Sequence, residues 1–358
     1  MPEPLKNLYN EALINALSEQ LSVQCAEFDS AGFSRYIFDK EWQEKELKAR
    51  MAHISAAFNQ FIPLSYPEQL EVLMAISPNF SGFESMFFPG FVELYGLDDY
   101  DNSIVALEHF TKNSSSEFAV RPFIIKYNHK MMTQMEAWSE SGNHHVRRLA
   151  TEGCRSRLPW AMALPEFKKN PSAVMTILER LKNDDSEYVR RSVANNLNDI
   201  SKDNPNVVID KAKQWIGGSK ETDWVVKHGC RTLLKQGESN IMALFGYEKP
   251  EHIKIKDFEL PSVTRIGDSI TFEFTLVSQQ ALGKLRIEYA VNHLKKNGSH
   301  TRKVFKLSES ENRNKIKLIS KSHSFKKIST RVYYAGIHGI AIIVNGHEIA
   351  YQEFQLDN

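Results

Sequence analysis

Four segments of this 358-residue chain align with one another, and such a repeat leaves few architectures open. The copies are SEFAVRPFIIKY (116–127), NHHVRRLATEGC (143–154), SEYVRRSVANNL (186–197) and TDWVVKHGCRTL (222–233). They start 27, 43 and 36 residues apart, which is typical of helix pairs that stack into HEAT-type solenoids. Apolar residues recur every three or four positions in 47–62, as in an amphipathic helix. The repeat therefore predicts a helical solenoid.

Equivalent positions of the repeat predict a line of positive charge. The sixth position of the four copies holds Arg121, Arg148, Arg191 and Lys227. Because a solenoid stacks equivalent positions along one face, we expect these side chains to form a row. A cationic row suits a groove that follows the phosphates of DNA. Basic residues of repeat helices also bridge to neighbouring acids, and the sequence leaves this simpler interpretation open.

The pattern changes after Tyr247. Residues 1–247 have helical periodicity, whereas residues 248–261 contain two prolines and little periodicity. We therefore predict a helical-repeat domain over 1–247, a linker over 248–261 and a second domain over 262–358. The length of the chain suits two or three domains.

The second domain has the short alternating pattern of β-strands. The expected strands are 269–278, 284–294, 301–308, 315–325, 331–337, 341–349 and 350–356. The dipeptides Asn297-Gly298 and Asn345-Gly346 are typical of tight hairpin turns. About seven strands in about 100 residues predict an all-β immunoglobulin-like sandwich.

Cysteine usage and hydropathy indicate the compartment. Cys25, Cys154 and Cys230 lie far apart without CxxC spacing, which argues against a disulfide framework or a zinc site. The first residues lack the pattern of a secretory signal, and no stretch approaches 18 consecutive apolar residues. We expect a reduced, cytoplasmic, monomeric protein that has no membrane span and needs no cofactor or metal.

The net charge of +1 conceals a gradient along the chain. Residues 1–113 hold 7 Lys and Arg against 17 Asp and Glu, a net charge of −10. Residues 114–250 hold 21 against 16, or +5, and residues 251–358 hold 17 against 11, or +6. An anionic partner should therefore meet the middle and the C-terminal part of the chain.

The stretch HHVRRLATEGCRSRLPWAM (144–162) places four arginines around one carboxylate, Glu152. On a helix over 146–155, Arg148 and Arg155 share a face with Glu152. Pro159 should end the helix, and Trp160 should project from the turn beyond it.

Each of these residues also has a purely structural interpretation. Glu152 fits a solvated acid in weak surface ion pairs, and Trp160 fits a position in the core. Glu117 follows Ser114-Ser-Ser in the pattern of a capping box, where the acid bonds back to the start of a helix. The sequence alone does not exclude these interpretations.

The segments HVRRLATEGCRSRLPWA (145–161) and EFAVRPFI (117–124) resemble the AlkC branch of the HEAT-like alkylpurine DNA glycosylases, which are relatives of AlkD. The resemblance extends over most of residues 1–247. A C-terminal immunoglobulin-like domain occurs in one subset of this family, in agreement with the predicted second domain. The resemblance implies excision of cationic alkylated purines, chiefly N3-methyladenine, from double-stranded DNA without full extrusion of the nucleotide.

The resemblance also implies roles for individual residues. It makes Glu117 and Glu152 the catalytic acids, while Trp160 and Phe118 would hold the sugar and the lesion through cation–π attraction. Arg148, Arg155 and Arg157 would grip the phosphates beside the lesion. These roles agree with the chemistry, because a carboxylate stabilises the oxocarbenium-like sugar that forms when a charged purine leaves.

A predicted hairpin in the second domain has a basic tip. Its cations are Lys295, Lys296, Arg302, Lys303 and Lys306. Extra contact with the DNA duplex is one interpretation, and lysine protection of a solvated sheet edge is the other. For the whole chain, the alternative to a glycosylase is a catalytically silent repeat scaffold that binds DNA or a protein partner.

Overall fold

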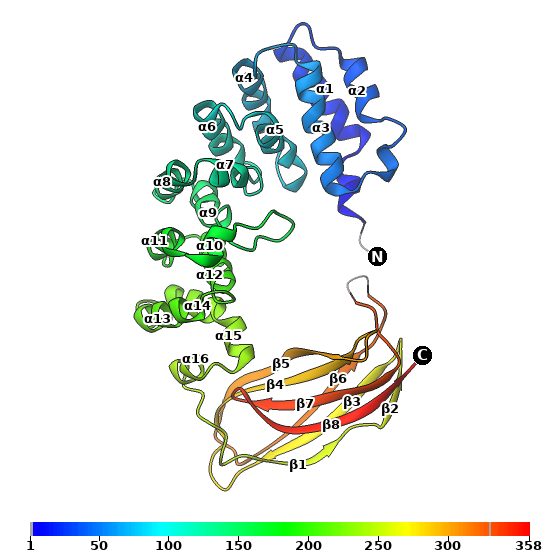
Figure 1. Ribbon diagram of the computed structural model, residues 1–358, viewed down its shortest axis with the longest axis vertical. Coiled ribbons are helices and arrows are strands. Elements are labelled where there is room, and N and C mark those ends of the chain that lie inside the picture. Colours follow the sequence, from blue (N-terminus) through cyan, green and yellow to red (C-terminus); the bar gives the residue numbers. More distant parts are fainter. Residues whose placement is uncertain (1–2, 329–330) are drawn as a thin grey trace. The chain divides into compact units, whose positions relative to one another are not determined.

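The computed structural model describes residues 3–328 and 331–358. The chain forms two compact units. The helical unit comprises Met1–Val208 and Gln214–Gly229, and the sandwich unit comprises Ile209–Lys213 and Cys230–Asn358. A helical repeat followed by an immunoglobulin-like sandwich is the fold class that the sequence predicts, and the structure confirms it (Figure 1).

Helices of the helical unit follow one another in a stacked series (Figure 1). The α-helices are α1 (Glu11–Gln24), α2 (Ser30–Ile37), α3 (Leu47–Phe61), α4 (Tyr66–Ile76), α5 (Phe87–Tyr95), α6 (Tyr100–Thr111), α7 (Val120–Lys126), α8 (Asn128–Trp138), α9 (His144–Glu152), α10 (Pro165–Lys169), α11 (Ser172–Leu181), α12 (Glu187–Ile200), α13 (Pro205–Trp215) and α14 (Lys220–Gly229). Short 3₁₀ helices are η1 (Leu5–Leu8), η2 (Trp42–Glu44), η3 (Ser77–Asn79) and η4 (Phe83–Met86). Helix α9 packs against α8, α11 and α12, so residues of successive repeats meet around it.

Helix α9 shows how the local sequence sets its two ends. It begins where the Asn143 side chain accepts a hydrogen bond from the His145 backbone N–H at 2.8 Å, as an N-cap does. It ends at Glu152, three residues earlier than the expected 146–155. Gly153 follows, and a Cβ there would lie 2.6 Å from the Val120 side chain of α7. A glycine at this position lets the end of α9 approach α7 closely.

The predicted capping box before α7 is wrong. Helix α7 begins at Val120, after Glu117. The Ser114 hydroxyl donates instead to the Gly82 carbonyl at 2.9 Å. Glu117 does not cap α7 and instead forms an ion pair with Arg148.

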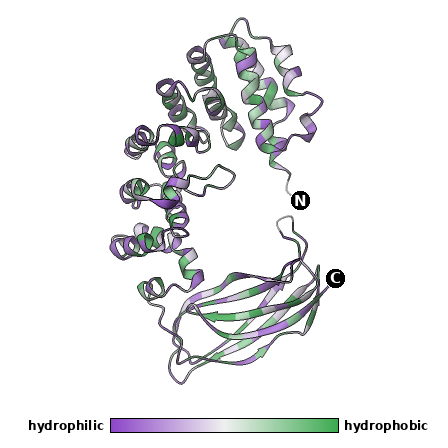
Figure 2. Ribbon diagram, in the orientation of Figure 1, coloured by the Kyte–Doolittle hydropathy of each residue, from purple (hydrophilic) through white to green (hydrophobic). Residues whose placement is uncertain are grey.

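Besides the middle of α13, the sandwich unit contains two short helices and two sheets, in which the strands pair antiparallel except for the parallel pair β2–β8. Its elements are α15 (Arg231–Gln236), α16 (Ser239–Leu244), β1 (Lys254–Glu259), β2 (Val263–Arg265), β3 (Ser269–Val277), β4 (Gly283–Leu294), β5 (His300–Asn312), β6 (Ile316–Ser324), β7 (Gly336–Val344) and β8 (His347–Asp357). One sheet has the order β1-β3-β6 and the other β2-β8-β7-β4-β5. Hydrophobic and hydrophilic residues alternate along β3 (Figure 2), and its inward rings, Phe272 and Phe274, lie in the core between the sheets.

The observed strands differ from the expected ones at both ends of the domain. Strand β1 lies inside the expected linker and pairs with β3. The expected strand over 331–337 is wrong, because β7 begins only at Gly336. The last two strands divide at Asn345-Gly346, whose φ angles of 47° and 80° form the tight turn, and not at residue 349.

The three cysteines lie in the interior of the protein. Cys25, Cys154 and Cys230 are all buried and free of disulfides. Among the described residues, no helix is long and apolar enough to cross a membrane.

Candidate active site

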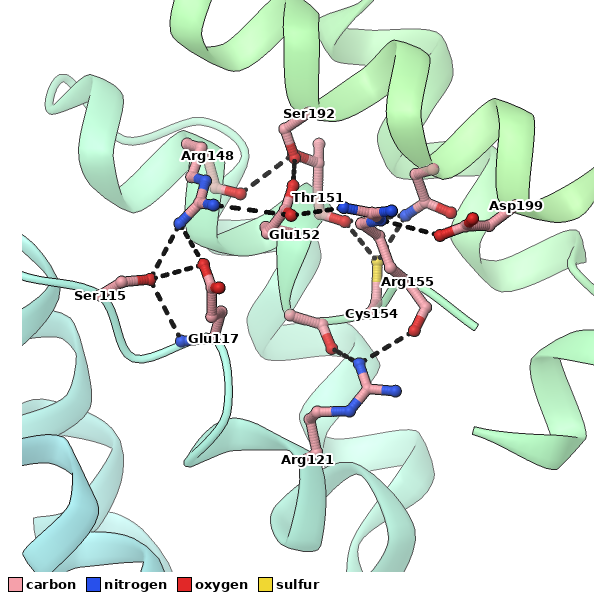
Figure 3. A network of polar contacts seen from close by, with 12 residues as sticks. Ser115, Glu117, Arg121, Arg148, Thr151, Glu152, Cys154, Arg155, Ser192 and Asp199 are labelled. Carbon is pink, nitrogen blue, oxygen red and sulfur yellow. Dashed lines mark hydrogen bonds and ion pairs between the residues drawn. The ribbon is translucent and has the colours of Figure 1, made fainter. Parts of the chain in front are cut away.

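Helix α9 and the loop before α7 bring the two predicted acids to one guanidinium. Arg148, one turn before Glu152 on α9, contacts Glu117 Oε2 through Nη1 (Figure 3). Its Nη2 lies 3.5 Å from Glu152 Oε1. The side chains of Glu117 and Glu152 are only 15% and 7% exposed. Neither acid therefore points into bulk solvent, and Arg148 joins the two.

Glu152 is a buried, ionised carboxylate. Its Oε1 accepts a hydrogen bond from Arg155 Nη1 at 2.6 Å, and its Oε2 accepts one from Ser192 Oγ of α12 at 2.6 Å. Burial acts to raise the pKa of this carboxyl, but the charges of Arg148 and Arg155 outweigh burial and hold the pKa below its usual value. The interpretation of Glu152 as a solvated surface acid is wrong, because α12 and the loop after α9 cover it.

Arg148 is held on several sides. Its Nη1 donates to Ser115 Oγ at 2.8 Å, and the Ser115 hydroxyl donates to Glu117 Oε2 at 2.8 Å. The Tyr188 ring of α12 covers the guanidinium, with Cζ 4.9 Å from the ring centroid. These contacts fix the position of the bridging cation between the two acids.

Arg155 connects Glu152 to a third acid. Its Nε donates to Asp199 Oδ2 of α12 at 2.8 Å while Nη1 binds Glu152. Asp199 also accepts from Lys202 Nζ at 3.0 Å. Arg155 is only 7% exposed, and its guanidinium binds these two carboxylates. The prediction that Arg155 contacts a phosphate is therefore wrong, and the residue belongs to the buried network.

The two predicted aromatic residues differ in exposure. Trp160 is 63% exposed, so the interpretation as a core residue is wrong. Its backbone carbonyl accepts from Lys48 Nζ at 2.8 Å, and its ring meets Phe83 edge-on at 6.3 Å. Phe118 is buried at 7% exposure, with Lys48 Nζ 4.8 Å from its ring centroid. Trp160 is therefore accessible to a ligand. The prediction that Phe118 also stacks against the sugar or the lesion is wrong, because its ring is buried.

The expected row of exposed cations is not formed, and the prediction fails at Arg121. This side chain is fully buried. Its Nε donates to the Met162 carbonyl at 2.8 Å, and its Nη1 donates to the carbonyls of Gly153 and Arg155, both at 2.9 Å. Burial lowers the pKa of Arg121 to about 10, so the group stays charged at neutral pH. A guanidinium enclosed in this way cannot reach a phosphate.

The other predicted cations of the helical unit lie nearer the surface. Exposed Arg157 binds Asp203 through Nε at 2.8 Å, and exposed Arg191 binds Glu187 at 2.5 Å. Lys227 is half-buried on α14. Bridging to neighbouring acids, the simpler of the two interpretations of the row, thus describes Arg148 and Arg191 in this structure.

The predicted basic hairpin forms between β4 and β5. Its predicted DNA-binding cations, Lys295, Lys296, Arg302 and Lys303, are all exposed. Arg302 pairs with Glu348 at 2.7 Å, and Lys303 lies over the Phe305 ring at 5.2 Å.

Sequence reasoning missed the residues of α12 that complete the network. Ser192 and Asp199 are seven residues apart, and this spacing puts both on one face of the helix. That spacing was the available signal, although Asp199 lies two residues beyond the third repeat copy, which ends at Leu197. Within the described ranges, no group of three or more His, Cys, Asp or Glu side chains could hold a metal ion.

Known proteins similar to this chain share both of its units. A family model described as DNA alkylation repair enzyme matches residues 104–232, and one described as the C-terminal Ig-like domain of uncharacterised protein YhaZ matches residues 254–358. Uncharacterized protein YhaZ of Bacillus subtilis (strain 168) is 44% identical over 98% of this chain and 99% of its own length. The structure of Pseudomonas fluorescens alkylpurine DNA glycosylase AlkC bound to DNA containing an abasic site analog is 36% identical. It covers 99% of this chain and 100% of its own, with a TM-score of 0.94.

The chain belongs to the AlkC family of alkylpurine DNA glycosylases. The resemblance drawn from the sequence is thus confirmed. In this AlkC-family chain, the region matched as a DNA alkylation repair enzyme contains Glu117, Glu152 and Trp160. The polar network around Arg148 therefore lies inside that region.

Proposed function

We propose that this chain is a monofunctional DNA glycosylase that removes cationic alkylated purines, chiefly N3-methyladenine, from double-stranded DNA in base excision repair. One observation carries the proposal. Glu117 and Glu152 are enclosed in a frame of arginines within a helical repeat whose relatives include an alkylpurine DNA glycosylase. A scaffold gains nothing from two buried acids joined by one arginine.

The reaction uses the negative charge of these acids. Alkylation at N3 makes the purine cationic, so it departs as a neutral base when its N-glycosidic bond breaks. The deoxyribose is left with oxocarbenium character, which a nearby carboxylate stabilises. Water then adds at C1′, and a carboxylate accepts its proton. Glu152 is suited to this role because its arginine neighbours keep it ionised.

We assign the remaining DNA contacts by exposure. Trp160 would stack against the sugar or the cationic lesion. Arg157, Arg191 and Lys227 would bind phosphates, with the surface carboxylates that now pair with Arg157 and Arg191 giving way to them. The hairpin lysines of the sandwich unit would add further backbone contacts.

Release of methylated purines from alkylated duplex DNA tests the proposal. We expect wild type to release N3-methyladenine faster than N7-methylguanine, and Glu152→Gln and Glu117→Gln each to slow release by about 100-fold or more, since each removes a transition-state charge. The matched control is Glu166→Gln, which neutralises an exposed acid that pairs with Lys169 and should keep the rate within twofold. No release by wild type would support the silent scaffold. Full activity of Glu152→Gln would overturn the assignment of that acid.

A further inference from the structure

We infer that Arg121 is a positioning residue: it holds the loop after α9 in the shape that presents Trp160 to the substrate. The loop runs from Gly153 to Leu164 and carries Arg155, Arg157 and Trp160. The inference rests on the proposed glycosylase function, because it concerns the geometry of that same site.

The contacts of Arg121 tie the two ends of the loop together. Nη1 binds the carbonyls of Gly153 and Arg155 at its start, and Nε binds the Met162 carbonyl near its end. One planar guanidinium thus fixes three backbone groups on both sides of Trp160 (Figure 3 shows the contact with Arg155). Few other side chains could do this, because arginine presents several donors in a rigid fork.

The burial of Arg121 is not explained by helix packing alone. Its guanidinium is enclosed and charged, and its Nη2 has no hydrogen-bond partner among the described residues. Burying such a group is unfavourable unless its bonds compensate. The three hydrogen bonds recorded for it all go to loop carbonyls. Arg121 therefore stabilises the conformation of the loop.

The loop needs such a tie around Trp160, because this residue is not held by burial as Leu158 and Leu164 are. The Trp160 side chain is 63% exposed, and its backbone has a positive φ of 63°, which is unfavourable for a bulky residue. The Lys48 bond to the Trp160 carbonyl is a second tie, made by an exposed side chain. Without Arg121, the backbone at Trp160 should relax to more favourable conformations.

Arg50 offers a matched control for this experiment. It too is a buried arginine of the helical unit, 4% exposed, and it donates to the backbone carbonyls of Lys45 and Lys6 at 3.1 and 3.0 Å. These partners lie in the N-terminal segment and not in the loop. Arg50→Met should therefore reproduce the loss of a buried guanidinium without releasing Trp160.

The experiment measures catalysis and loop mobility on the full chain. A Trp224→Phe background leaves Trp160 as the exposed tryptophan, since Trp42, Trp138 and Trp215 are at most 4% exposed. In this background we expect Arg121→Met to lower the single-turnover rate at least tenfold while changing the Kd for DNA less than threefold. Acrylamide quenching and fluorescence anisotropy should show a more mobile Trp160. Arg121→Lys should restore part of the single-turnover rate and part of the rigidity of Trp160, because one ammonium can bind some of the carbonyls.

The outcomes separate this inference from the proposed function. Equal rates and equal Trp160 mobility in Arg121→Met and Arg50→Met would overturn it, as would a slower rate with an unchanged Trp160 signal. If Arg121→Met does not fold, Arg121→Lys is judged by the same two measurements. An inactive wild type would refute the glycosylase proposal, and the Trp160 signal would still decide whether Arg121 holds the loop.

Discussion

At the scale of single residues, the role proposed for Glu152 requires a buried carboxylate that stays ionised. Burial disfavours the carboxylate, and Arg148 and Arg155 reverse that effect. The folded-state pKa is therefore below the ordinary value of a glutamate. If Glu152 must be ionised for catalysis, the rate should stay constant as pH falls to the ordinary carboxyl range, and then decrease below it.

Removal of one arginine should shift the decrease in rate at low pH, the acid limb of the pH–rate profile, to higher pH. In Arg148→Met, Glu152 loses one of its two cationic neighbours, so its pKa should rise. The decline in single-turnover rate should then begin at a higher pH than in wild type, whatever the rate on the plateau. The measurement is the pH–rate profile on alkylated DNA after subtraction of spontaneous depurination. Arg157→Met is the control, because Arg157 binds Asp203; an acid limb that shifts equally in both variants would contradict the assignment.

Sequence spacing predicted the contacts of Glu152 with residues near it in the chain, and not the contacts that come from α12. Arg148 and Arg155 stand four residues before and three after Glu152, and helical geometry brings such neighbours together. Ser192 and Asp199 come from α12, about 40 residues later in the chain. Their approach depends on how one repeat stacks on the next, which a local pattern does not encode. For the same reason Arg121 was placed in the groove, although the following loop encloses it.

At the scale of elements, the strands β4, β6 and β7 bury a cluster of histidines. His293 and His323 are ring neighbours at 6.0 Å, and His293 and His338 at 5.9 Å. Both ring nitrogens of His293 are buried without a partner among the described residues, while His323 Nδ1 lies 2.9 Å from the Tyr289 hydroxyl. Burial lowers the pKa of His293 to about 3 and that of His323 to about 4. Other nearby groups also disfavour protonation; they are Arg331, Lys303, Lys321 and His300.

The cluster predicts a sandwich unit that loses stability in mild acid. Between about pH 6.5 and pH 4 the unfolded chain binds protons at His293 and His323 that the folded unit excludes, so stability falls as pH falls. Hydrogen exchange of amides in β4 and β7, corrected for its intrinsic pH dependence, should speed up by about tenfold or more from pH 7 to pH 5. His293→Phe should reduce this effect, and exposed His347→Ala should not. The same acid sensitivity in all three proteins would contradict the prediction.

The strands were predicted correctly where the sequence has both an alternating hydrophobic pattern and a turn motif. The period of β3 and the turn at Asn297-Gly298 place β3, β4 and β5 close to where they occur. The centre of the sandwich was harder, since β7 is buried on both faces from His338 to Val344 and an unbroken apolar run has no period that marks its ends. Strand β1 was missed because pairing with β3 organises a segment that has prolines on both sides.

At the scale of the whole molecule, the charge gradient predicts which parts of the chain would contact DNA in the proposed function. The acidic segment 1–113 should repel phosphates, whereas residues 114–358 carry a net positive charge. Each lysine that neutralises a phosphate on binding releases condensed counterions, which steepens the salt dependence of affinity. The number of such contacts can therefore be read from the slope of log K against log salt.

The hairpin tip of the sandwich unit is the sharpest test of this assignment. Lys295 and Lys296 are both exposed at the β4–β5 turn. If both contact phosphates, Lys295→Ala with Lys296→Ala should lower the magnitude of the salt slope by about 2 and weaken binding equally for damaged and undamaged duplexes. The single-turnover rate at saturating protein should not change, because the tip holds the backbone and not the lesion. Lys40→Ala with Lys112→Ala removes the same charge from the acidic segment and should leave the slope unaltered; an identical slope in both double variants would show that the hairpin lysines only protect a solvated sheet edge.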